Sequence, residues 1–125
     1  MMYGHLMSLV KGAFDSEQVE AERVAIAGRK LGFTPYKIKV PARTLTSILD
    51  EANVSKIDFF SLDVEGFELN ALQGLDFEKY RPEFMLIECL DEKSFQAINS
   101  YISDYYDLFE RASQVDYLFK SKDDE

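Results

Sequence analysis

Cysteine, histidine and positive charge are scarce in this sequence. The single cysteine, Cys89, cannot form a disulfide within the chain, and one histidine with one cysteine cannot supply the ligands of a zinc site. The 14 lysine and arginine residues are outnumbered by 23 aspartate and glutamate residues, which gives a formal charge of −9. Because such a charge is repelled by phosphate backbones, a nucleic-acid-binding protein is disfavoured.

Long hydrophobic runs are also absent. No apolar stretch approaches the roughly 18 residues that cross a bilayer, and no signal-peptide pattern precedes the first charged segment. We therefore expect no membrane span and a cytoplasmic location. With 46% hydrophobic and 30% charged residues, the composition is that of a globular protein rather than a disordered one. The 125 residues suit a single domain, with an irregular start over residues 1–14 and a frayed tail over 121–125.

Capping residues and hydrophobic spacing predict several helices. The first begins at Asp15 or Ser16, because either side chain can accept hydrogen bonds from the N–H groups of a first helical turn. It ends at Gly32, a residue type that favours helix termination. Further helices are expected over residues 44–53, from 67 to a stop at 74, and after a cap at 91.

Short apolar runs between these helices predict strands. Ile57–Leu62 and Phe84–Ile87 are nearly continuous apolar runs, which is typical of buried strands in parallel sheets. Tyr36–Val40 alternates between apolar and basic residues and predicts a short strand with one exposed face. Tyr106–Arg111 and Val115–Lys120 predict a closing hairpin. The order of elements indicates an α/β fold, with a mostly parallel sheet, an antiparallel edge and helices on its faces.

Acidic residues follow the ends of two predicted strands. Asp63 and Glu65 come directly after the first buried strand, and Glu88 ends the next one. In open parallel sheets, ligands bind beyond the carboxyl ends of the strands. If Asp63 and Glu65 are extended, their side chains point to the same side. Gly66 permits a sharp turn, and Glu68 then falls in the first turn of a helix, where the helix dipole favours an anion.

This acidic cluster is suited to three roles: a general base, an acceptor for ligand hydroxyl or ammonium groups, or a set of hard-metal ligands. The alternative interpretation is that Glu68 only begins a helix, that Glu65 is solvated, and that Glu88 marks the point where burial stops. Other reactive side chains are weaker candidates. His5 has no partner nearby, so we expect it to be exposed. Cys89 has no histidine to activate it, so we expect a buried, unreactive thiol.

The stretch Ile57–Leu69, with Asp-Val-Glu-Gly-Phe-Glu at 63–68 and Ala-Leu-Gln-Gly at 71–74, resembles the signature of FkbM-type methyltransferases. Val40–Leu49 resembles the segment that precedes this signature, and Arg81–Glu88 resembles the strand that follows it. The resemblance extends over residues 4–88 and is compatible with the remainder. Two positions depart from the pattern: Thr46 replaces a common acid, and Ser61 replaces a common lysine.

This resemblance implies an enzyme that transfers a methyl group from S-adenosylmethionine to a hydroxyl of a small molecule or sugar. By the same resemblance, Asp63 and Glu65 are the catalytic candidates, and Asp63, Glu65 and Glu68 are the cofactor-binding candidates. No metal is expected. Such enzymes open with a strand, a glycine-rich turn and a helix, and nothing before Gly32 has that arrangement. We therefore expect the C-terminal part of a Rossmann-like methyltransferase sheet, with little activity in isolation.

An incomplete sheet leaves Ile57–Leu62 as an apolar edge strand, which is prone to pair with another chain. We expect self-association, or completion by another polypeptide, through this strand. Two other functions stay open. The first is a non-catalytic truncated or split module that acts in assembly or binding. The second is a metal site formed by Asp63, Glu65 and Glu68 that supports hydrolysis.

Overall fold

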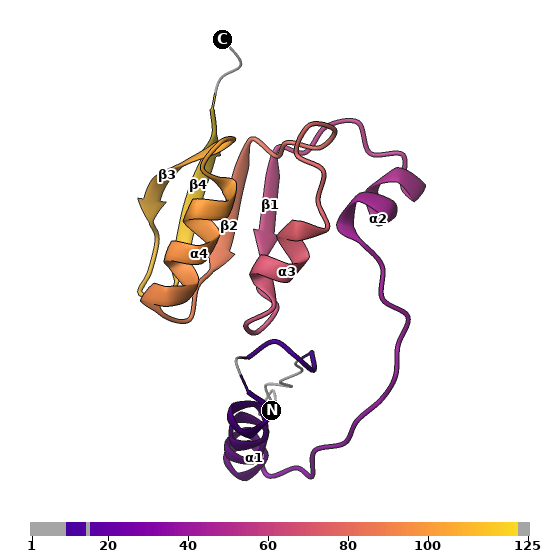
Figure 1. The fold of residues 1–125 in the computed structure, drawn as a ribbon, viewed down its shortest axis with the longest axis vertical. Helices are drawn as coiled ribbons and strands as arrows, with labels where there is room; N and C mark the ends of the chain where they lie inside the picture. The colour runs from indigo at the N-terminus through magenta and orange to yellow at the C-terminus, as the bar shows by residue number, and fades with distance from the viewer. Residues whose placement is uncertain (1–9, 15, 123–125) are drawn as a thin grey trace, which may run out of the picture.

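The computed structural model describes residues 10–14 and 16–122, which form four helices and four strands (Figure 1). His5, Asp15 and the last three residues lie outside the described residues. The elements are α1 (Glu17–Leu31), α2 (Leu45–Glu51), β1 (Phe59–Leu62), α3 (Glu68–Gln73), β2 (Phe84–Glu88), α4 (Glu92–Ile102), β3 (Tyr106–Arg111) and β4 (Asp116–Ser121).

The four strands form one sheet in the order β1-β2-β4-β3. β1 and β2 are parallel, with Phe60 opposite Met85, whereas β4 runs antiparallel to both β2 and β3. The predicted α/β class is correct, and the arrangement is consistent with part of a Rossmann-like sheet. The expectation of a mostly parallel sheet is wrong for the described residues. The crossover through α4 leads to the outer strand β3, and the hairpin that follows returns the chain beside β2 in the opposite direction.

The predicted helix ends are present. In three helices the capping side chain accepts a hydrogen bond from the backbone N–H three residues later: Ser16 in α1, Thr44 in α2 and Asp91 in α4. α1 ends at Gly32, whose φ of 70° lies in the left-handed region. Among the described residues, the helices are too short or too polar to cross a membrane.

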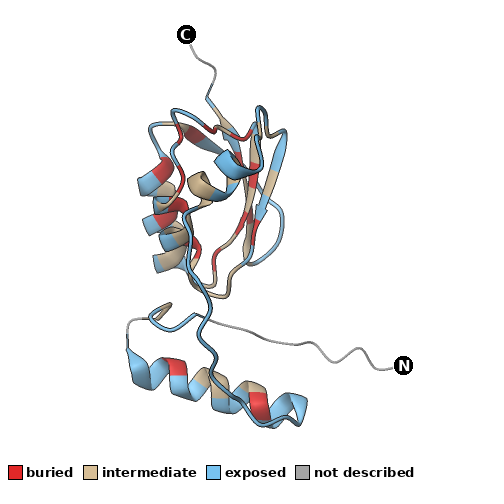
Figure 2. Ribbon diagram, turned by 90° about the vertical axis from the view of Figure 1, so that its right-hand side faces the viewer, coloured by how far each residue is buried: buried red, intermediate tan, exposed pale blue. Residues whose placement is uncertain are grey.

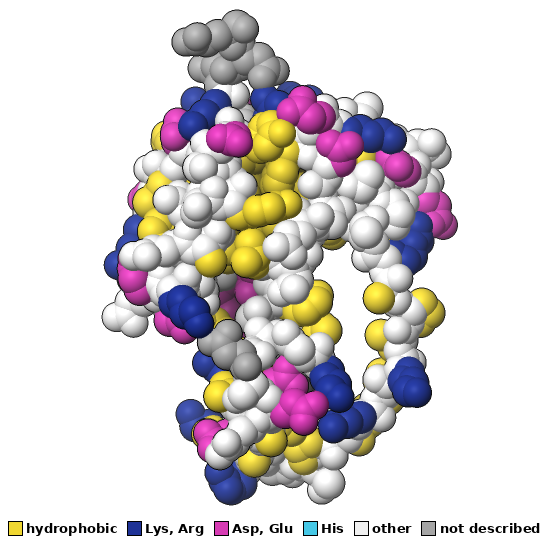
Figure 3. Space-filling view, in the orientation of Figure 1, with side chains coloured by type: hydrophobic (Ala, Val, Ile, Leu, Met, Phe, Trp, Pro, Cys, Tyr) yellow, Lys and Arg dark blue, Asp and Glu magenta, His cyan; other side chains and the backbone are white. Residues whose placement is uncertain are grey.

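The predicted strand over Tyr36–Val40 is wrong. This part of the chain lies in the connection between α1 and α2, which stands away from the sheet and leaves an opening beside it (Figures 1 and 3). Tyr36, Ile38 and Val40 are 85%, 70% and 70% exposed. A strand requires a neighbour for its backbone N–H and C=O groups, and no described segment lies beside this one as a partner.

The core lies on the side of the sheet that α3 and α4 cover (Figure 2). It contains apolar residues from alternate positions of the strands, from both helices and from the loop after α3, and its fully buried members include Leu72, Met85, Ile87, Ile102, Tyr106 and Phe119. The buried hydroxyl of Tyr106 donates a 2.7 Å hydrogen bond to the Pro82 carbonyl, so the one polar atom of that side chain is paired.

α1 contributes little to this core. Its apolar residues Val19, Ile26 and Leu31 are between 39% and 48% exposed, and the helix lies apart from the sheet in Figure 2. At the other end, Ser121 belongs to β4, and the N–H of Lys122 donates to the Tyr105 carbonyl at 2.8 Å. The tail predicted from residue 121 is therefore wrong at its first two positions.

Candidate active site at the ends of two parallel strands

The carboxyl ends of β1 and β2 meet at one edge of the sheet because the two strands are parallel (Figure 1). Leu62 pairs with Ile87 near these ends. Asp63 directly follows Leu62, and Glu88 is the last residue of β2. The structure therefore brings together two acids that are far apart in the sequence.

The chain turns sharply after Asp63. The N–H of Phe67 donates to the Val64 carbonyl at 3.2 Å, and the two central residues, Glu65 and Gly66, have φ values of 52° and 95°. Two consecutive positive φ angles are the pattern of a type I′ turn. The expected extended geometry at Glu65 is therefore wrong. A left-handed conformation at a residue with a Cβ costs about 1 kcal/mol, so this turn needs support from its surroundings.

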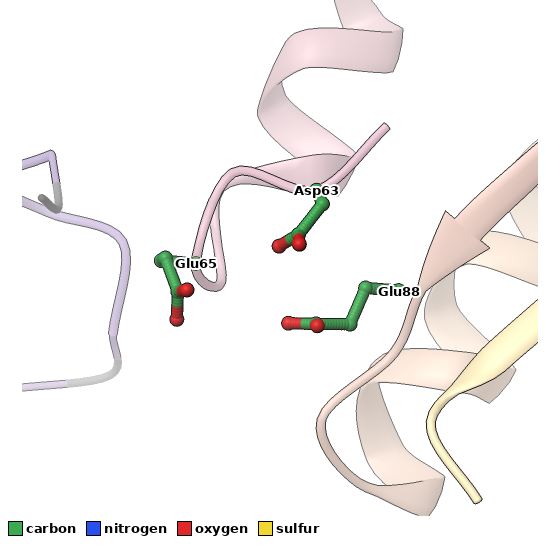
Figure 4. Close-up of side chains that lie close together, drawn as sticks. All are labelled: Asp63, Glu65 and Glu88. Carbon is green, nitrogen blue, oxygen red and sulfur yellow. The ribbon is translucent and has the colours of Figure 1, made fainter. Parts of the chain in front are cut away.

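Three carboxylates face one another at this edge (Figure 4). One oxygen each from Asp63, Glu65 and Glu88 lies within 4.8 Å of the other two. Asp63 is exposed, while Glu65 and Glu88 are half-buried. Like charges at such separations repel, so holding the three side chains together costs free energy. The turn therefore brings the Glu65 carboxylate near that of Asp63, although the backbone at Glu65 is left-handed and not extended.

Glu88 is the member of this cluster that titrates near neutrality. Partial burial raises the pKa of Glu88 from 4.5 to about 7, and the negative charges of Asp63, Glu65, Glu68 and Asp116 add to the effect. A general base works best when its pKa lies near the operating pH. The sequence placed Glu88 at the correct strand end, but its burial and its acidic neighbours depend on the packed sheet.

Glu68 has a different position from the other acids. Its side chain is buried, and Oε1 accepts hydrogen bonds from the N–H groups of Val64 and Gly66 at 2.9 and 3.3 Å. These bonds support the turn from inside, while the N-cap of α3, Phe67, makes no side-chain capping hydrogen bond. Glu68 lies outside the group of three converging carboxylates. Its contacts fit the alternative of a helix-start residue better than a ligand contact.

Cys89 is buried, with an exposed fraction of 2%. Burial, with nearby acids, raises the pKa of its thiol to about 12, so the reactive thiolate does not form at neutral pH. The prediction that Cys89 is buried is confirmed. Cys89 borders an open hollow of about 690 Å³ between the start of α4 and the β3–β4 hairpin. Cys89, which lines this hollow, follows Glu88 in the sequence.

The N-terminal segment borders the cluster on the side opposite β2. In Figure 4 its backbone, drawn in faint lavender, lies beside Glu65. The Phe14 ring lies against Gly66, within 3.0 Å of where a Cβ on that residue would be. Phe14 was not identified from the sequence, because no spacing rule connects an isolated phenylalanine to a turn so far along the chain. The positive φ at Glu65 was likewise missed, since Glu-Gly is a weak signal for this turn type.

A family-model comparison matches residues 4–119 to the Methyltransferase FkbM domain. The chain belongs to the FkbM methyltransferase family. No curated protein and no solved structure matches it. The match includes the turn at residues 63–68 and extends through most of β4, beyond the part of the chain on which the resemblance was first identified.

The FkbM chain also accommodates its two departures from the family pattern. Thr46 Oγ1 donates to the Gly74 carbonyl at 3.0 Å and accepts from the Asp76 N–H at 2.8 Å, so this residue joins the start of α2 to the loop after α3. Ser61 is exposed on β1. Neither position contributes to the group of three carboxylates.

The described residues fit one part of the methyl donor that the family implies. Carboxylates are good partners for positively charged groups and for hydroxyls, both of which S-adenosylmethionine carries. Residues 16–122 contain no glycine-rich turn between a strand and a helix. The strand-to-helix turn in this range that contains a glycine is the acidic turn at residues 63–67. The described residues thus offer carboxylate acceptors at this edge, without such a glycine-rich turn among them.

Proposed function

We propose that this chain forms the acid-bearing part of an S-adenosylmethionine-dependent O-methyltransferase, which methylates a hydroxyl of a small molecule or sugar. The observation that carries the proposal is the convergence of Asp63, Glu65 and Glu88 at the ends of the parallel pair, in a member of the FkbM family. Parallel sheets bind their ligands at this edge.

Methyl transfer to a hydroxyl requires a proton acceptor. When bound, S-adenosylmethionine supplies an activated methyl group. The acceptor hydroxyl would have to give up its proton to a residue of this chain as it is methylated. Glu88 is the preferred acceptor for that proton because its pKa is raised to about 7. Asp63 and Glu65 orient the reacting groups through hydrogen bonds and stabilise positive charge. This assignment extends the sequence-based choice of Asp63 and Glu65 by one residue.

We propose that the acceptor substrate lies in the hollow lined by Cys89 and the residues that follow it. Tyr117 forms part of its lining, and the Arg111 guanidinium lies 5.2 Å from the Tyr117 ring centre. Arg111 Nη2 also donates to the Gln114 carbonyl at 2.8 Å, so the cation is held in place. Tyr117 itself is buried and its ring is stacked on Phe95 at 4.3 Å, so the exposed Arg111 guanidinium is the group that this lining presents to a ligand.

Calorimetric titration with S-adenosylhomocysteine tests the donor site. We expect binding to the chain, weakened about tenfold or more by Asp63→Asn, which corresponds to about 1.4 kcal/mol. Asp104→Asn is the matched control, because Asp104 is an exposed acid away from the cluster. Absence of binding that is restored by a polypeptide carrying a glycine-rich loop supports a split enzyme. Absence of binding under both conditions contradicts the proposal.

The alternative is a non-catalytic module whose role is assembly. Its support is β1, which is the outer strand of the described sheet and has Phe59 56% exposed. Unpaired strand edges pair readily with other chains. We propose that β1 associates with a second copy or with a completing polypeptide, whether or not the site is active. Tyr36–Val40, exposed and alternating, is a second segment that such a partner would cover.

A metal site is the third candidate, with a changed ligand set. The sequence-based set of Asp63, Glu65 and Glu68 is wrong in one member, because Glu88 and not Glu68 joins the converging oxygens. Mg²⁺ or Mn²⁺ titration distinguishes this function. Affinity that disappears in Asp63→Asn supports a metal site, and unchanged heats in both proteins exclude it.

A further inference from the structure

The turn that carries Glu65 is packed against an aromatic ring from the N-terminal segment. A Cβ placed on Gly66 would lie 2.9 Å from Phe14 Cε1 and 3.0 Å from Phe14 Cζ. Real Cβ atoms do not approach other atoms so closely, so the contact depends on the absence of a side chain at residue 66. Gly66 therefore serves two purposes: it adopts the positive φ, and it lets the ring reach the backbone.

Phe14 is held in this position by α1. The guanidinium carbon of Arg23 lies 4.5 Å from the centre of the Phe14 ring, at cation–π distance. Glu20, which is 9% exposed, accepts a hydrogen bond through Oε1 from the N–H of Gly12. These contacts attach residues 12–14 to α1, a helix that otherwise has few buried side chains.

We propose that Phe14 is a positioning residue for the acidic cluster: by packing against Gly66, its ring holds the turn that directs the Glu65 carboxylate toward Asp63 and Glu88. Glu65 is in a left-handed conformation that costs about 1 kcal/mol, and the turn would relax without support. Glu68 supplies that support from within, through its two bonds to the turn. Phe14 supplies it from outside.

A role of Phe14 in catalysis rests on the proposed function. The packing of Phe14 against the turn can be tested without it. Glu65 is one of four acids whose charges act on Glu88, together with Asp63, Glu68 and Asp116. If the turn relaxes, Glu65 leaves the cluster and water enters. Both changes make the charged form of Glu88 easier to form.

The test is a carbon-13 NMR titration of the glutamate carboxyl groups in the full chain, with the Glu88 resonance assigned by its loss in Glu88→Gln. We expect Phe14→Ala to lower the Glu88 midpoint by about half a pH unit or more. Phe14→Tyr keeps the ring and restores the midpoint. Phe109→Ala is the matched control, since Phe109 is an exposed phenylalanine on β3. A folded Phe14→Ala protein with an unchanged midpoint overturns the proposal.

A double-mutant cycle provides a second measurement that does not depend on the titration. Gly66→Ala is strained in any background because of its φ of 95°. The clash with the ring exists only when Phe14 is present, so Gly66→Ala destabilises the wild-type chain more than the Phe14→Ala chain. Equal destabilisation in the two backgrounds contradicts the packing. Both measurements require no donor or acceptor, so absence of S-adenosylhomocysteine binding with and without a completing polypeptide would refute the proposed function without affecting this inference.

Discussion

Glu65 combines a charged side chain with a backbone conformation that glutamate rarely adopts. Its φ is 52°, in a turn type that strongly prefers Asn-Gly or Asp-Gly at the central positions. Its carboxylate also lies near two others. A residue that is unfavourable for both backbone and charge is typical of a functional site, where the local cost is carried by surrounding structure.

Replacing Glu65 by asparagine is expected to stabilise the protein. Asparagine tolerates the left-handed conformation and removes one negative charge, so Glu65→Asn should raise the free energy of unfolding by about 1 kcal/mol, measured by urea denaturation. Glu65→Gln is the control that removes the charge without helping the turn. If Gln stabilises as much as Asn, charge repulsion alone is responsible.

Glu88 makes stability depend on pH in a specific window. Its pKa is about 7 in the folded protein and 4.5 as its ordinary value. Between these values the folded state holds more protons than the unfolded state, so the free energy of unfolding falls as the pH rises from 4.5 to 7, and this contribution levels off above 7. Denaturation series at several pH values should show a flatter curve for Glu88→Gln than for the wild type. Glu110→Gln, an exposed acid on β3, should leave the curve unchanged.

At the scale of elements, two hydrogen-bonding side chains join parts of the site that lie apart. Glu68 connects the start of α3 to the turn after β1, and Thr46 connects the start of α2 to the loop after α3. Both side chains serve backbone groups that have lost partners at the end of an element. The arrangement of elements around the acids therefore depends on a few polar contacts as well as on the apolar core.

Removing the Glu68 side chain should destabilise the turn. Glu68→Ala leaves the half-buried N–H groups of Val64 and Gly66 without their acceptor, at a cost of about 1 kcal/mol. Glu68→Gln retains an acceptor oxygen and should cost less. Thermal unfolding followed by circular dichroism measures both. Equal loss in the two variants would show that charge, rather than hydrogen bonding, supports the turn.

Thr46 tests the connection between α2 and the loop after α3. Thr46→Val keeps the shape of the side chain but removes the bonds to the Gly74 carbonyl and the Asp76 N–H, and we expect a loss of about 1–2 kcal/mol. Thr46→Ser keeps the hydroxyl and should retain most of the stability. Chemical denaturation that does not distinguish Val from Ser at this position would contradict the role of the two bonds.

At the scale of the whole molecule, β1 is the outer strand of the described sheet, and we propose that the chain associates through it. Light scattering at micromolar concentration should show a mass above that of one chain. Phe59→Lys places a charge on the exposed edge and should shift the protein toward the monomer. Lys56→Gln is a control that changes a charge near β1 without placing a new charge on the strand. A wild-type protein that is monomeric throughout would contradict association through this edge.

Much of the fold could be predicted because its signals are local. The caps of α1, α2 and α4 depend on single polar residues, and the buried strands depend on short apolar runs. Tyr36–Val40 shows the limit of such signals. Its alternation of apolar and polar residues is typical of a strand. A strand also needs a neighbouring strand, and a pattern within five residues does not indicate whether one is present.

The acidic site divides in the same way between local pattern and assembled structure. The sequence by itself determined that Asp63, Glu65 and Glu88 would lie at strand ends, that Glu68 would begin a helix, and that the chain resembles the FkbM methyltransferases. Only the tertiary structure decided that Glu65 turns back toward Glu88, that Glu68 bonds to the turn, and that Phe14 packs on Gly66. The reason is physical: helix caps and strand patterns act over a few residues, whereas carboxylate repulsion, burial and ring packing depend on distances that folding alone creates.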